Sequence, residues 1–338
     1  MSIIKKIEKA CLLGRGGAGF PTHIKWQSVA KAKSKTKYLI INGAEGEPGI
    51  YKDGYIIKNL LKEFSIGVKI ASDTIKATKI YFYLNGKYYD IYKNKIIKEF
   101  NKAGLKGKFE IIKKPKGAGY IGGEESTILN IIEGGRAEPR LRPPFPTEKG
   151  LFGQPTLINN IETLYDVYLV SINKFSGERF YSINIENKNK GVYSLPDDLS
   201  IKDVLIKTKN YPKYDFFVQV GGDASGEVFN QKQLRRKVPG AGSITIYKLS
   251  NHRPEKLVNY WLSFFADNSC GQCTPCREGT YRLLELFKNK RSYLKDVSDF
   301  VDLCKNLETS SFCALGACAP IAILSYFKNV YPNLCQKK

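Results

Sequence analysis

The eight cysteines of this 338-residue chain are placed very unevenly, and their placement constrains the fold more than any other feature. Cys11 stands alone near the start, and no other cysteine occurs before Cys270. Seven then fall in the last part of the chain: Cys270, Cys273, Cys276, Cys304, Cys313, Cys318 and Cys335. The disulfides of a small secreted domain would be spread through a short chain. A late cluster in a chain whose N-terminus shows no secretory signal predicts a metal centre instead.

Three of these cysteines, Cys270, Cys273 and Cys276, form a C-x-x-C-x-x-C run. Two-residue gaps let a loop bring neighbouring thiolates to one centre, and this spacing fits three corners of a 4Fe–4S cubane, which takes four cysteines. Cys313 is the best candidate for the fourth ligand, and Cys318 is its rival. A zinc ion held by four thiolates is the alternative, although zinc sites usually pair two C-x-x-C knuckles. We interpret the remaining cysteines as packed thiols rather than ligands.

Composition excludes several classes of function. The formal net charge is +22 and comes mainly from lysine, which indicates a solvated basic surface and also suits dinucleotide phosphates and acidic partner subunits. No zinc finger, RNP motif or basic leucine zipper accompanies this charge, so no nucleic-acid partner is expected. No window approaches the ~18 uninterrupted apolar residues of a membrane span. We therefore expect a cytoplasmic protein without a membrane span of its own.

The order of the expected elements predicts three domains. Residues 1–168 alternate short apolar strands with helical stretches such as Asp53–Ile75, which is typical of an α/β domain. Residues 169–250 hold four strand-like segments and one short helix, which favours a β-grasp domain. Residues 251–338 show apolar residues at helical spacing, so the late cysteines are expected on a small helical bundle. The strands expected in the first domain are Tyr38–Ile41, Ile80–Leu84 and Phe109–Ile112.

Three glycine-rich loops in the first domain are candidate ligand sites. The first, Gly14–Phe20, lacks side chains that would keep phosphate oxygens away from backbone N–H groups, and Lys25 follows it. The second, Asn42–Gly49, carries two carboxylates directly after an apolar strand, where α/β sheets bind ligands. The third, Gly117–Ser126, opens a helix, and its paired acids also suit a helix N-terminus without any cofactor. Each loop alone is a weak signal.

Taken together, these segments resemble one family over nearly the whole chain. The family is the flavin- and NADH-binding subunit shared by NADH:quinone oxidoreductase (complex I, where it is the F-type subunit), NAD-reducing hydrogenases and NAD-dependent formate dehydrogenases. The segments that carry the resemblance occur in the family's order: GRGGAGFPTHIKW (14–26), NGAEGEPGIYKD (42–53), GAGYIGGEES (117–126), PRLRPPFP (139–146), GQPTLINNIET (153–163), SCGQCTPCREGT (269–280) and CALG (313–316).

The resemblance implies a Rossmann-like FMN-binding α/β domain, a β-grasp (SLBB-like) domain and a C-terminal helical bundle carrying an iron–sulfur cluster. It implies FMN, NAD(H) and one 4Fe–4S cluster as cofactors. By position in the motifs, the FMN residues are Gly14, Gly16, Gly17, Lys25, Asn42, Glu45, Tyr120, Gly123, Glu124, Asn159 and Asn160. The residues implied for NADH are Phe20, Glu47, Glu125, Arg142 and Phe145, and the cluster ligands are Cys270, Cys273, Cys276 and Cys313.

The resemblance also implies an activity and partners. A flavin accepts the two electrons of a hydride and releases them singly, so it belongs between NADH and an iron–sulfur cluster. The expected function is therefore electron input: NADH is oxidised through FMN, and single electrons pass to the cluster and on to partner subunits. A thioredoxin-like 2Fe–2S subunit and further iron–sulfur subunits are implied as partners, and the complex could lie on the inner face of a membrane.

The chain departs from the family's pattern at several positions, mostly in the nicotinamide pocket. Ala44 replaces a usual Asp, Gly122 replaces a common Cys, and Arg142 replaces a usual Lys, which keeps the charge but changes the geometry. Ser28 stands where an aromatic residue is common. The family's R-G-E-Y is absent from Tyr83–Tyr89. These departures keep two alternatives open: an electron-relay subunit that has lost NADH binding, and a preference for NADPH.

Overall fold

The computed structural model describes residues 1–186, 188–250, 252–288 and 297–331. The chain divides into two compact units. The first consists of residues 1–46, 51–180 and 194–197, and the second of residues 47–50, 181–193 and 198–338. The second unit thus takes in a short segment, Glu47–Ile50, that follows a strand of the first. No helix within the described ranges is long and apolar enough to cross a membrane.

The first unit is built on a four-stranded parallel sheet in the order β3-β2-β1-β4. The chain moves outward from β1 through β2 to β3 and then returns to place β4 on the other side of β1. Parallel sheets of this kind bind ligands where the strand order reverses, beyond the carboxyl ends of the strands. The strands are β1 (Tyr38–Gly43), β2 (Lys79–Leu84), β3 (Phe109–Lys113) and β4 (Thr156–Asn160).

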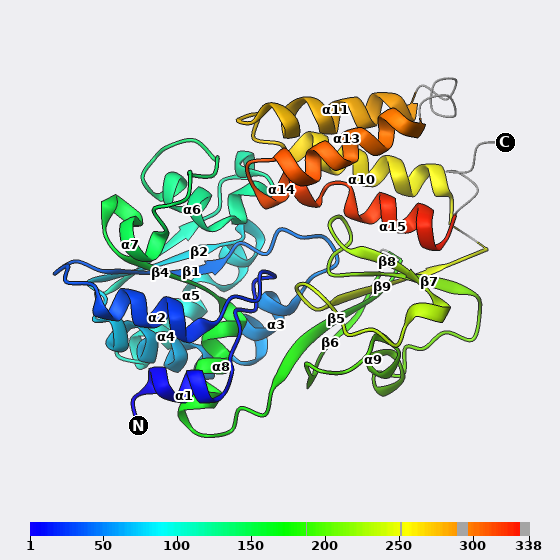
Figure 1. Ribbon diagram of the computed structural model, residues 1–338. Coiled ribbons are helices and arrows are strands. Elements are labelled where there is room, and N and C mark those ends of the chain that lie inside the picture. The colour runs from blue at the N-terminus through cyan, green and yellow to red at the C-terminus, as the bar shows by residue number, and fades with distance from the viewer. Residues whose placement is uncertain (187, 251, 289–296, 332–338) are drawn as a thin grey trace. The chain divides into compact units, whose positions relative to one another are not determined.

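Helices pack on both faces of this sheet (Figure 1). On one face Ile40, Tyr81 and Ile158 are neighbours in register and pack against Leu129 of α6. On the other face Phe82 contacts aromatic rings of α4 and α5. The helices of this unit are α1 (Ile3–Lys9), α2 (Thr22–Lys31), α3 (Lys52–Asn59), α4 (Leu61–Ile75), α5 (Gly86–Lys102), α6 (Glu125–Ile132), α7 (Pro146–Lys149) and α8 (Ile161–Ser171), with short 3-10 turns at Lys116–Ala118, Ile121–Gly123 and Leu151–Gly153.

The second unit combines a five-stranded mixed sheet, in the order β6-β5-β9-β7-β8, with helices. The central strand β9 pairs parallel with β5 and antiparallel with β7. The indole of Trp261 in α10 donates to the backbone carbonyl of Asp223 at 3.0 Å, which ties the helices to the sheet. The elements are β5 (Glu178–Ile185), β6 (Lys188–Pro196), α9 (Ile201–Lys207), β7 (Phe216–Val220), β8 (Glu227–Asn230), a 3-10 turn (Gln231–Gln233), β9 (Ser243–Lys248), α10 (Pro254–Asn268), α11 (Thr274–Lys288), α13 (Val297–Ser310), α14 (Ala314–Cys318) and α15 (Ile321–Asn329).

Most elements expected from the sequence are present with small shifts of their ends. The three strands expected in the first domain correspond to β1, β2 and β3, and the single helix expected in the second corresponds to α9. The stretch Asp53–Ile75 is two helices rather than one, because Leu60 leaves helical geometry at φ −129° and ψ 26°. Strands β4 and β8 were not expected. Cys11 and Cys335 were both interpreted above as packed thiols. This interpretation is wrong for Cys11, whose side chain is exposed, and Cys335 lies outside the described residues.

Candidate functional site

The first and third glycine loops and residues 42–46 of the second lie beyond the carboxyl ends of β1 and β4. The amide of Asn42, at the end of β1, donates to the carbonyl of Gly123 in the third loop at 2.9 Å. A Cβ placed on Gly123 would lie 3.3 Å from the Cβ of Ala44, and one on Gly16 would lie 3.7 Å from the Cβ of Asn160. Side chains at these glycines would fill the space between the loops. The structure therefore places the predicted loops and strand ends at one edge of the sheet, at its switch point.

Asn159 and Asn160, predicted to line the flavin, are both held by hydrogen bonds from neighbouring side chains or backbone. The indole of Trp26 donates to the side-chain oxygen of Asn159 at 2.9 Å. Asn160 caps the start of α8, because its side-chain oxygen accepts from the backbone N–H of Glu162 at 3.0 Å. The same oxygen accepts from the Lys52 ammonium at 2.8 Å. These contacts leave both amide side chains little rotational freedom at the edge of the sheet.

A buried ion cluster lies under Asn160. The ammonium of Lys52 is 3.0 Å from a carboxylate oxygen of Asp53 and 3.0 Å from one of Glu162, and all three side chains are at most 3% exposed. The Asn160 amide also donates to Asp53 at 2.9 Å. Burial costs these charges hydration, so each depends on its partners. The cluster therefore holds Asn160 in place through a set of mutually dependent contacts.

Arg15, within the first glycine loop, is also buried, and its contacts anchor the loop to the rest of the unit rather than face a phosphate. Its guanidinium is 3.1 Å from Asp166 of α8 and 3.1 Å from Asp197, and it donates to the backbone carbonyl of Glu178 at 3.0 Å. Its backbone N–H donates to the Thr163 hydroxyl at 2.9 Å. The loop between Gly14 and Phe20 is thereby anchored to α8. A Cβ on Gly17 or Gly19 would meet no atom within 4 Å, so the far side of the loop stays open.

Glu45, predicted to line the flavin, directs its carboxylate to the start of α3. The carboxylate accepts from the backbone N–H of Asp53 at 2.8 Å and from the Tyr88 hydroxyl at 2.5 Å. Burial of the carboxyl, together with the neighbouring charge of Asp53, raises the pKa of Glu45 to about 8, although the Tyr88 hydrogen bond and Lys52 act the other way. The Glu45 carboxyl is therefore protonated over a pH range in which an ordinary glutamate is ionised.

This shifted pKa gives a pH dependence of stability. Between pH 4.5, the ordinary value, and about 8 the folded state keeps a proton on Glu45 that the unfolded state has released. The free energy of unfolding of the apoprotein should therefore fall as pH rises through this range, and level off above it. In Glu45→Gln this decline should be shallower, whereas Glu8→Gln, which changes an exposed residue, should keep the parent slope. Urea unfolding at several pH values would measure both, and equal slopes in all three proteins would contradict the assignment.

Two predicted cations are held by the paired acids of the third loop. Lys25 forms an ion pair with Glu125, the first residue of α6, and lies 5.8 Å from the centre of the Phe20 ring. Arg142 forms an ion pair with Glu124, whose carboxylate also accepts from two backbone N–H groups at the start of α6. The predicted FMN and NADH residues of these segments are thus brought together as two cation–acid pairs at one helix N-terminus, where anions are also favoured.

The remaining predicted NADH residues differ in their surroundings. Phe20 and Phe145 are 45% and 51% exposed, so their rings are accessible for stacking. Glu47 belongs to the second compact unit. Its carboxylate accepts from the backbone N–H of Ala224 at 3.0 Å and from that of Ser225 at 3.1 Å, and from the Ser225 hydroxyl. The structure thus gives Glu47 partners within the second unit, which the sequence did not predict.

The predicted cluster ligands gather at the start of α11 and the start of α14. Burial raises the pKa of the Cys276 thiol to about 11, and the charges of Cys273, Cys313 and Cys270 add to the effect. The pKa of the Cys313 thiol is raised by burial and by Cys270 and Cys273. All four predicted ligands are therefore electrostatic neighbours.

Cys318, the rival fourth ligand, has different neighbours. Burial raises the pKa of its thiol, and the one charge that adds to this effect is Glu47. No other cysteine within the described ranges contributes to the shift in the pKa of Cys318. Cys304 lies in α13 and is fully buried. Among the described residues, no three His, Cys, Asp or Glu side chains are grouped closely enough to hold a single metal ion. The arrangement thus favours Cys313 over Cys318 as the fourth neighbour of the C-x-x-C-x-x-C run.

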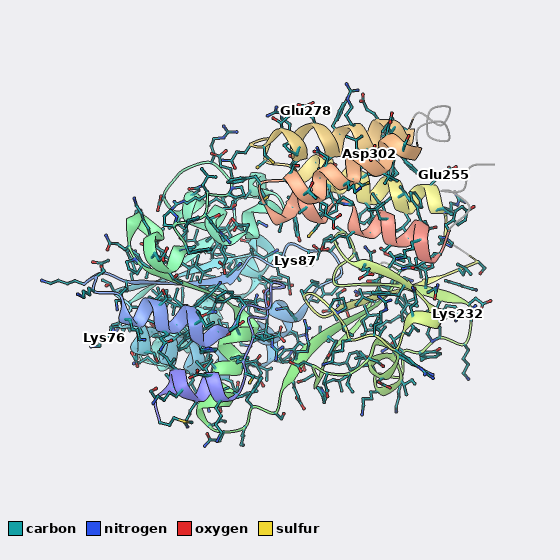
Figure 2. All side chains as sticks on the ribbon, in the orientation of Figure 1. Lys76, Lys87, Lys232, Glu255, Glu278 and Asp302 are labelled. Atoms are coloured by element: carbon teal, nitrogen blue, oxygen red, sulfur yellow. The ribbon has the colours of Figure 1, made fainter. Side chains whose placement is uncertain are left out.

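Two glycines position these cysteines. Gly271 has φ +79°, a conformation that other residues rarely adopt, and it turns the chain directly after Cys270. A Cβ on Gly316 would lie 3.0 Å from the Cβ of Cys276 and would clash with Ser311. Glycine at 316 therefore lets α14, which Cys313 precedes, approach α11. Beside this loop the Arg277 guanidinium donates to the Gly271 carbonyl at 3.0 Å and pairs with Glu278, which projects outward from α11 (Figure 2).

Several residues of the site were missed by the sequence analysis. The sequence did not indicate that Lys52 and Glu162 are buried, because a lysine or a glutamate in a helix is normally predicted to be exposed to solvent. The hydrogen bond of Tyr88 to Glu45 was not predicted, because the only feature noted in the segment of Tyr88 was the absence of the family's R-G-E-Y. The sequence did hold one indication of the buried ion cluster. The second motif ends in Tyr51-Lys52-Asp53, so a lysine and an aspartate follow a glycine-rich loop directly. The role of Gly316, which lets α14 approach α11, has no signature in the C-A-L-G motif itself.

Comparison with known proteins fits this geometry. A flavin-type cradle on an α/β unit, with a four-cysteine site on a helical bundle, defines a flavin- and iron–sulfur-binding electron-transfer protein. The Nuo51 FMN-binding domain family matches residues 7–169, and the NADH-ubiquinone oxidoreductase-F iron–sulfur binding region matches residues 256–336. The chain is 32% identical to the F subunit of the NADH-quinone oxidoreductase of Streptomyces coelicolor, over 97% of this chain and 82% of the relative. The chain belongs to the family of NADH-quinone oxidoreductase F subunits.

Other relatives extend the comparison. The corresponding F subunit of Aquifex aeolicus is 32% identical over 94% of this chain and 81% of its own length. The alpha subunit of the NAD-reducing hydrogenase HoxS of Cupriavidus necator is 31% identical over 99% of this chain but only 60% of its own length. A solved structure of an NAD+-reducing nickel–iron hydrogenase in the H2-reduced state superposes with a TM-score of 0.89 at 27% identity, over 98% of this chain and 62% of that chain. These matches confirm the fold class and the FMN and 4Fe–4S cofactors predicted from the sequence.

Proposed function

We propose that this chain is an electron-input subunit that oxidises NADH through FMN and passes single electrons to its 4Fe–4S cluster and on to partner subunits. The observation that carries the proposal is the convergence of three glycine loops, Asn159 and Asn160 at the switch point of the parallel sheet. Bound FMN would supply the conversion of a two-electron hydride into single electrons. The residues present fit it, because the loops leave backbone groups exposed and the polar side chains are fixed.

The chain's own residues would bind and orient the cofactors. Gly14, Gly16, Gly17 and Lys25 are assigned to the phosphate region of FMN, where Glu125 holds the Lys25 ammonium near the α6 terminus. Asn42, Glu45, Tyr120, Gly123, Glu124, Asn159 and Asn160 are assigned to the flavin. Phe20 and Phe145 would stack on the adenine of NADH, Glu125 is assigned to its ribose hydroxyls, and Arg142 is assigned to NADH. Glu47 keeps the assignment to NADH that its motif implies, although its carboxylate accepts from Ala224 and Ser225. Cys270, Cys273, Cys276 and Cys313 would ligate the cluster. No side chain is required as a general acid or base.

The proposal extends to organisation, partners and location. The domains proposed are 1–168 for FMN and NADH, 169–250 for the β-grasp part and 251–338 for the cluster. The relatives named above are subunits of NADH-quinone oxidoreductases and of a hydrogenase, which supports iron–sulfur subunits as partners. A thioredoxin-like 2Fe–2S subunit would accept electrons from this chain. We place the protein in the cytoplasm, peripheral to a membrane only through its complex.

Anaerobic titration of the reconstituted protein with NADH tests the proposed function. We expect stoichiometric bleaching of the flavin absorbance, followed by reduction of the cluster. NADPH at the same concentration should bleach it far more slowly. If NADH fails to bleach the flavin while dithionite reduces both cofactors, the chain is an electron-relay subunit without a nicotinamide site. Faster bleaching by NADPH would instead show a preference for NADPH, for which the guanidinium of Arg142 could supply a partner for the 2′-phosphate.

A further inference from the structure

Lys114 is a charged residue at the edge of the sheet to which no role has yet been given. It directly follows β3, and its backbone N–H donates to the carbonyl of Leu84 at 2.8 Å, which continues the parallel pairing by one residue. A Cβ placed on Gly46 would lie 3.2 Å from the Lys114 ammonium, and one on Gly122 would lie 3.1 Å from its Cε. The side chain therefore runs between the second and third glycine loops and ends at the partly open edge.

The ammonium of Lys114 has no hydrogen-bond acceptor and no carboxylate within the described part of the chain, in contrast to its neighbour. Lys113 pairs with Asp90 at 2.5 Å on the exposed side. Burial alone lowers the pKa of Lys114 to about 8, and no nearby acid offsets the effect. A partly buried ammonium without a counter-ion is unfavourable, and binding of a negatively polarised group would relieve that cost.

A second polar group without a partner lies beside the same glycine. The Tyr83 hydroxyl is buried, has no hydrogen-bond partner among the described residues, and lies 3.5 Å from a Cβ placed on Gly122. That Cβ would also lie 2.6 Å from the Cβ of Ala118, so the loop has no room for a larger residue at 122. The glycine that replaces the family's common cysteine thus allows the loop to close over the Lys114 side chain. The site depends on this chain's combination of Lys114 and Gly122.

We propose that Lys114 is a further flavin-binding residue, whose ammonium lies beside the isoalloxazine ring and favours its reduced, more negatively charged form. This inference rests on the proposed function. The position of the Lys114 ammonium favours contact with the isoalloxazine ring rather than with the phosphate. The ammonium lies near Gly46, Gly122 and Tyr120, since a Cβ on Gly46 would also lie 3.6 Å from the Tyr120 ring. Gly46 and Gly122 belong to the second and third glycine loops, whereas the phosphate is assigned to the first glycine loop and Lys25. A cation beside the ring binds reduced flavin more tightly than oxidised flavin and raises the midpoint potential.

The test compares flavin binding and flavin potential in four proteins: the parent, Lys114→Met, Lys114→Arg and Lys113→Met. Each apoprotein is reconstituted with FMN and, separately, with riboflavin, which lacks the phosphate. In Lys114→Met we expect reduced FMN to bind roughly 10- to 100-fold more weakly, as for loss of a charged hydrogen bond, while oxidised FMN changes by less than about threefold. The midpoint potential of the bound flavin should fall accordingly. Lys114→Arg should stay close to the parent because it keeps the charge, and Lys113→Met should match the parent.

Riboflavin separates the ring from the phosphate. If Lys114 acts on the ring, Lys114→Met weakens reduced riboflavin as much as reduced FMN. An effect seen with FMN alone would place the ammonium at the phosphate and overturn the proposal. Equal weakening of oxidised and reduced flavin, or an unchanged potential, would also overturn it by reducing Lys114 to a packing role. If the parent protein binds no FMN, the proposed function fails and this inference with it. If the parent binds FMN and Lys114→Met behaves like the parent, only this inference fails.

Discussion

Replacement of Cys313 by alanine should abolish the 4Fe–4S cluster, whereas replacement of Cys318 should not. Anaerobically reconstituted Cys313→Ala is expected to lose the four irons and four sulfides per chain that the parent carries, and with them the low-temperature EPR signal of the reduced cluster. Cys318→Ala and Cys304→Ala should keep iron, sulfide and signal near parental levels. FMN content should stay unchanged in all three, because the flavin residues belong to the other compact unit.

The physical reason is the grouping of thiols seen in the structure. Cys276 and Cys313 are electrostatic neighbours of Cys270 and Cys273, while no other cysteine in the part of the chain that the structure describes shifts the pKa of Cys318. Cluster ligands bind as thiolates around one centre. Burial is the main cause of the raised pKa values of Cys276 and Cys313, and the further contributions from the other cysteines show that these four thiols lie near one another. Backbone N–H groups of Leu315 and Gly316 face the Cys313 sulfur and would stabilise its thiolate.

The opposite result has a clear meaning. Loss of iron in Cys318→Ala, with iron retained in Cys313→Ala, would make Cys318 rather than Cys313 the fourth cluster ligand. The C-A-L-G turn would then contribute only to packing. Zinc in place of iron in the purified parent, with no gain of iron on reconstitution, would favour the structural zinc site that the spacing of the cysteines leaves open.

The sequence predicted the sheet of the first unit well where apolar runs were uninterrupted. Ile40 and Tyr81 lie in strands that alternate little between apolar and polar residues, as is typical of parallel strands buried on both faces. Strand β4 was not predicted because its apolar run is short: only Thr156, Leu157 and Ile158 precede two asparagines. The break at Leu60 was missed because both flanking helices share one apolar periodicity. Such a break depends on tertiary packing rather than on local propensity.

Within the candidate site, only residues that belong to recognisable sequence motifs could be predicted. Cysteine spacing and glycine loops carry their chemistry in local sequence, so the cysteine run and the first glycine loop were found. Which groups support them depends on pairs distant in the chain, such as Lys52 with Glu162 or Tyr88 with Glu45. A single sequence holds no record of such pairings. For the same reason the lone charge of Lys114 was recognisable only once the glycine loops around it were in place.

Replacement of Lys52 by methionine should cause the largest loss of stability among single changes in the flavin site. Lys52 is the cation that faces the buried carboxylates of Asp53 and Glu162, and it also holds Asn160 at 2.8 Å. Methionine keeps much of the length of the side chain but leaves two buried acids without their cation. Breaking a buried ion pair in this way costs about 3–5 kcal/mol, because the remaining charge is uncompensated. Urea unfolding of the apoprotein would measure the loss, and Lys58→Met, an exposed lysine of the same helix, is the matched control.

The pH dependence of this loss separates charge from packing. Lowering the pH protonates carboxylates that have lost their cation, so the difference in the free energy of unfolding between the parent and Lys52→Met should shrink as the pH is lowered from neutral into the acid range. A deficit that is independent of pH would mean that Lys52 contributes through packing alone. The affinity for FMN should also fall, since Asn160 loses the ammonium that fixes its amide at the edge of the sheet. Undiminished FMN binding in Lys52→Met would show instead that the capping of α8 by Asn160 is sufficient to orient it, and that the buried cluster serves the fold rather than the cofactor.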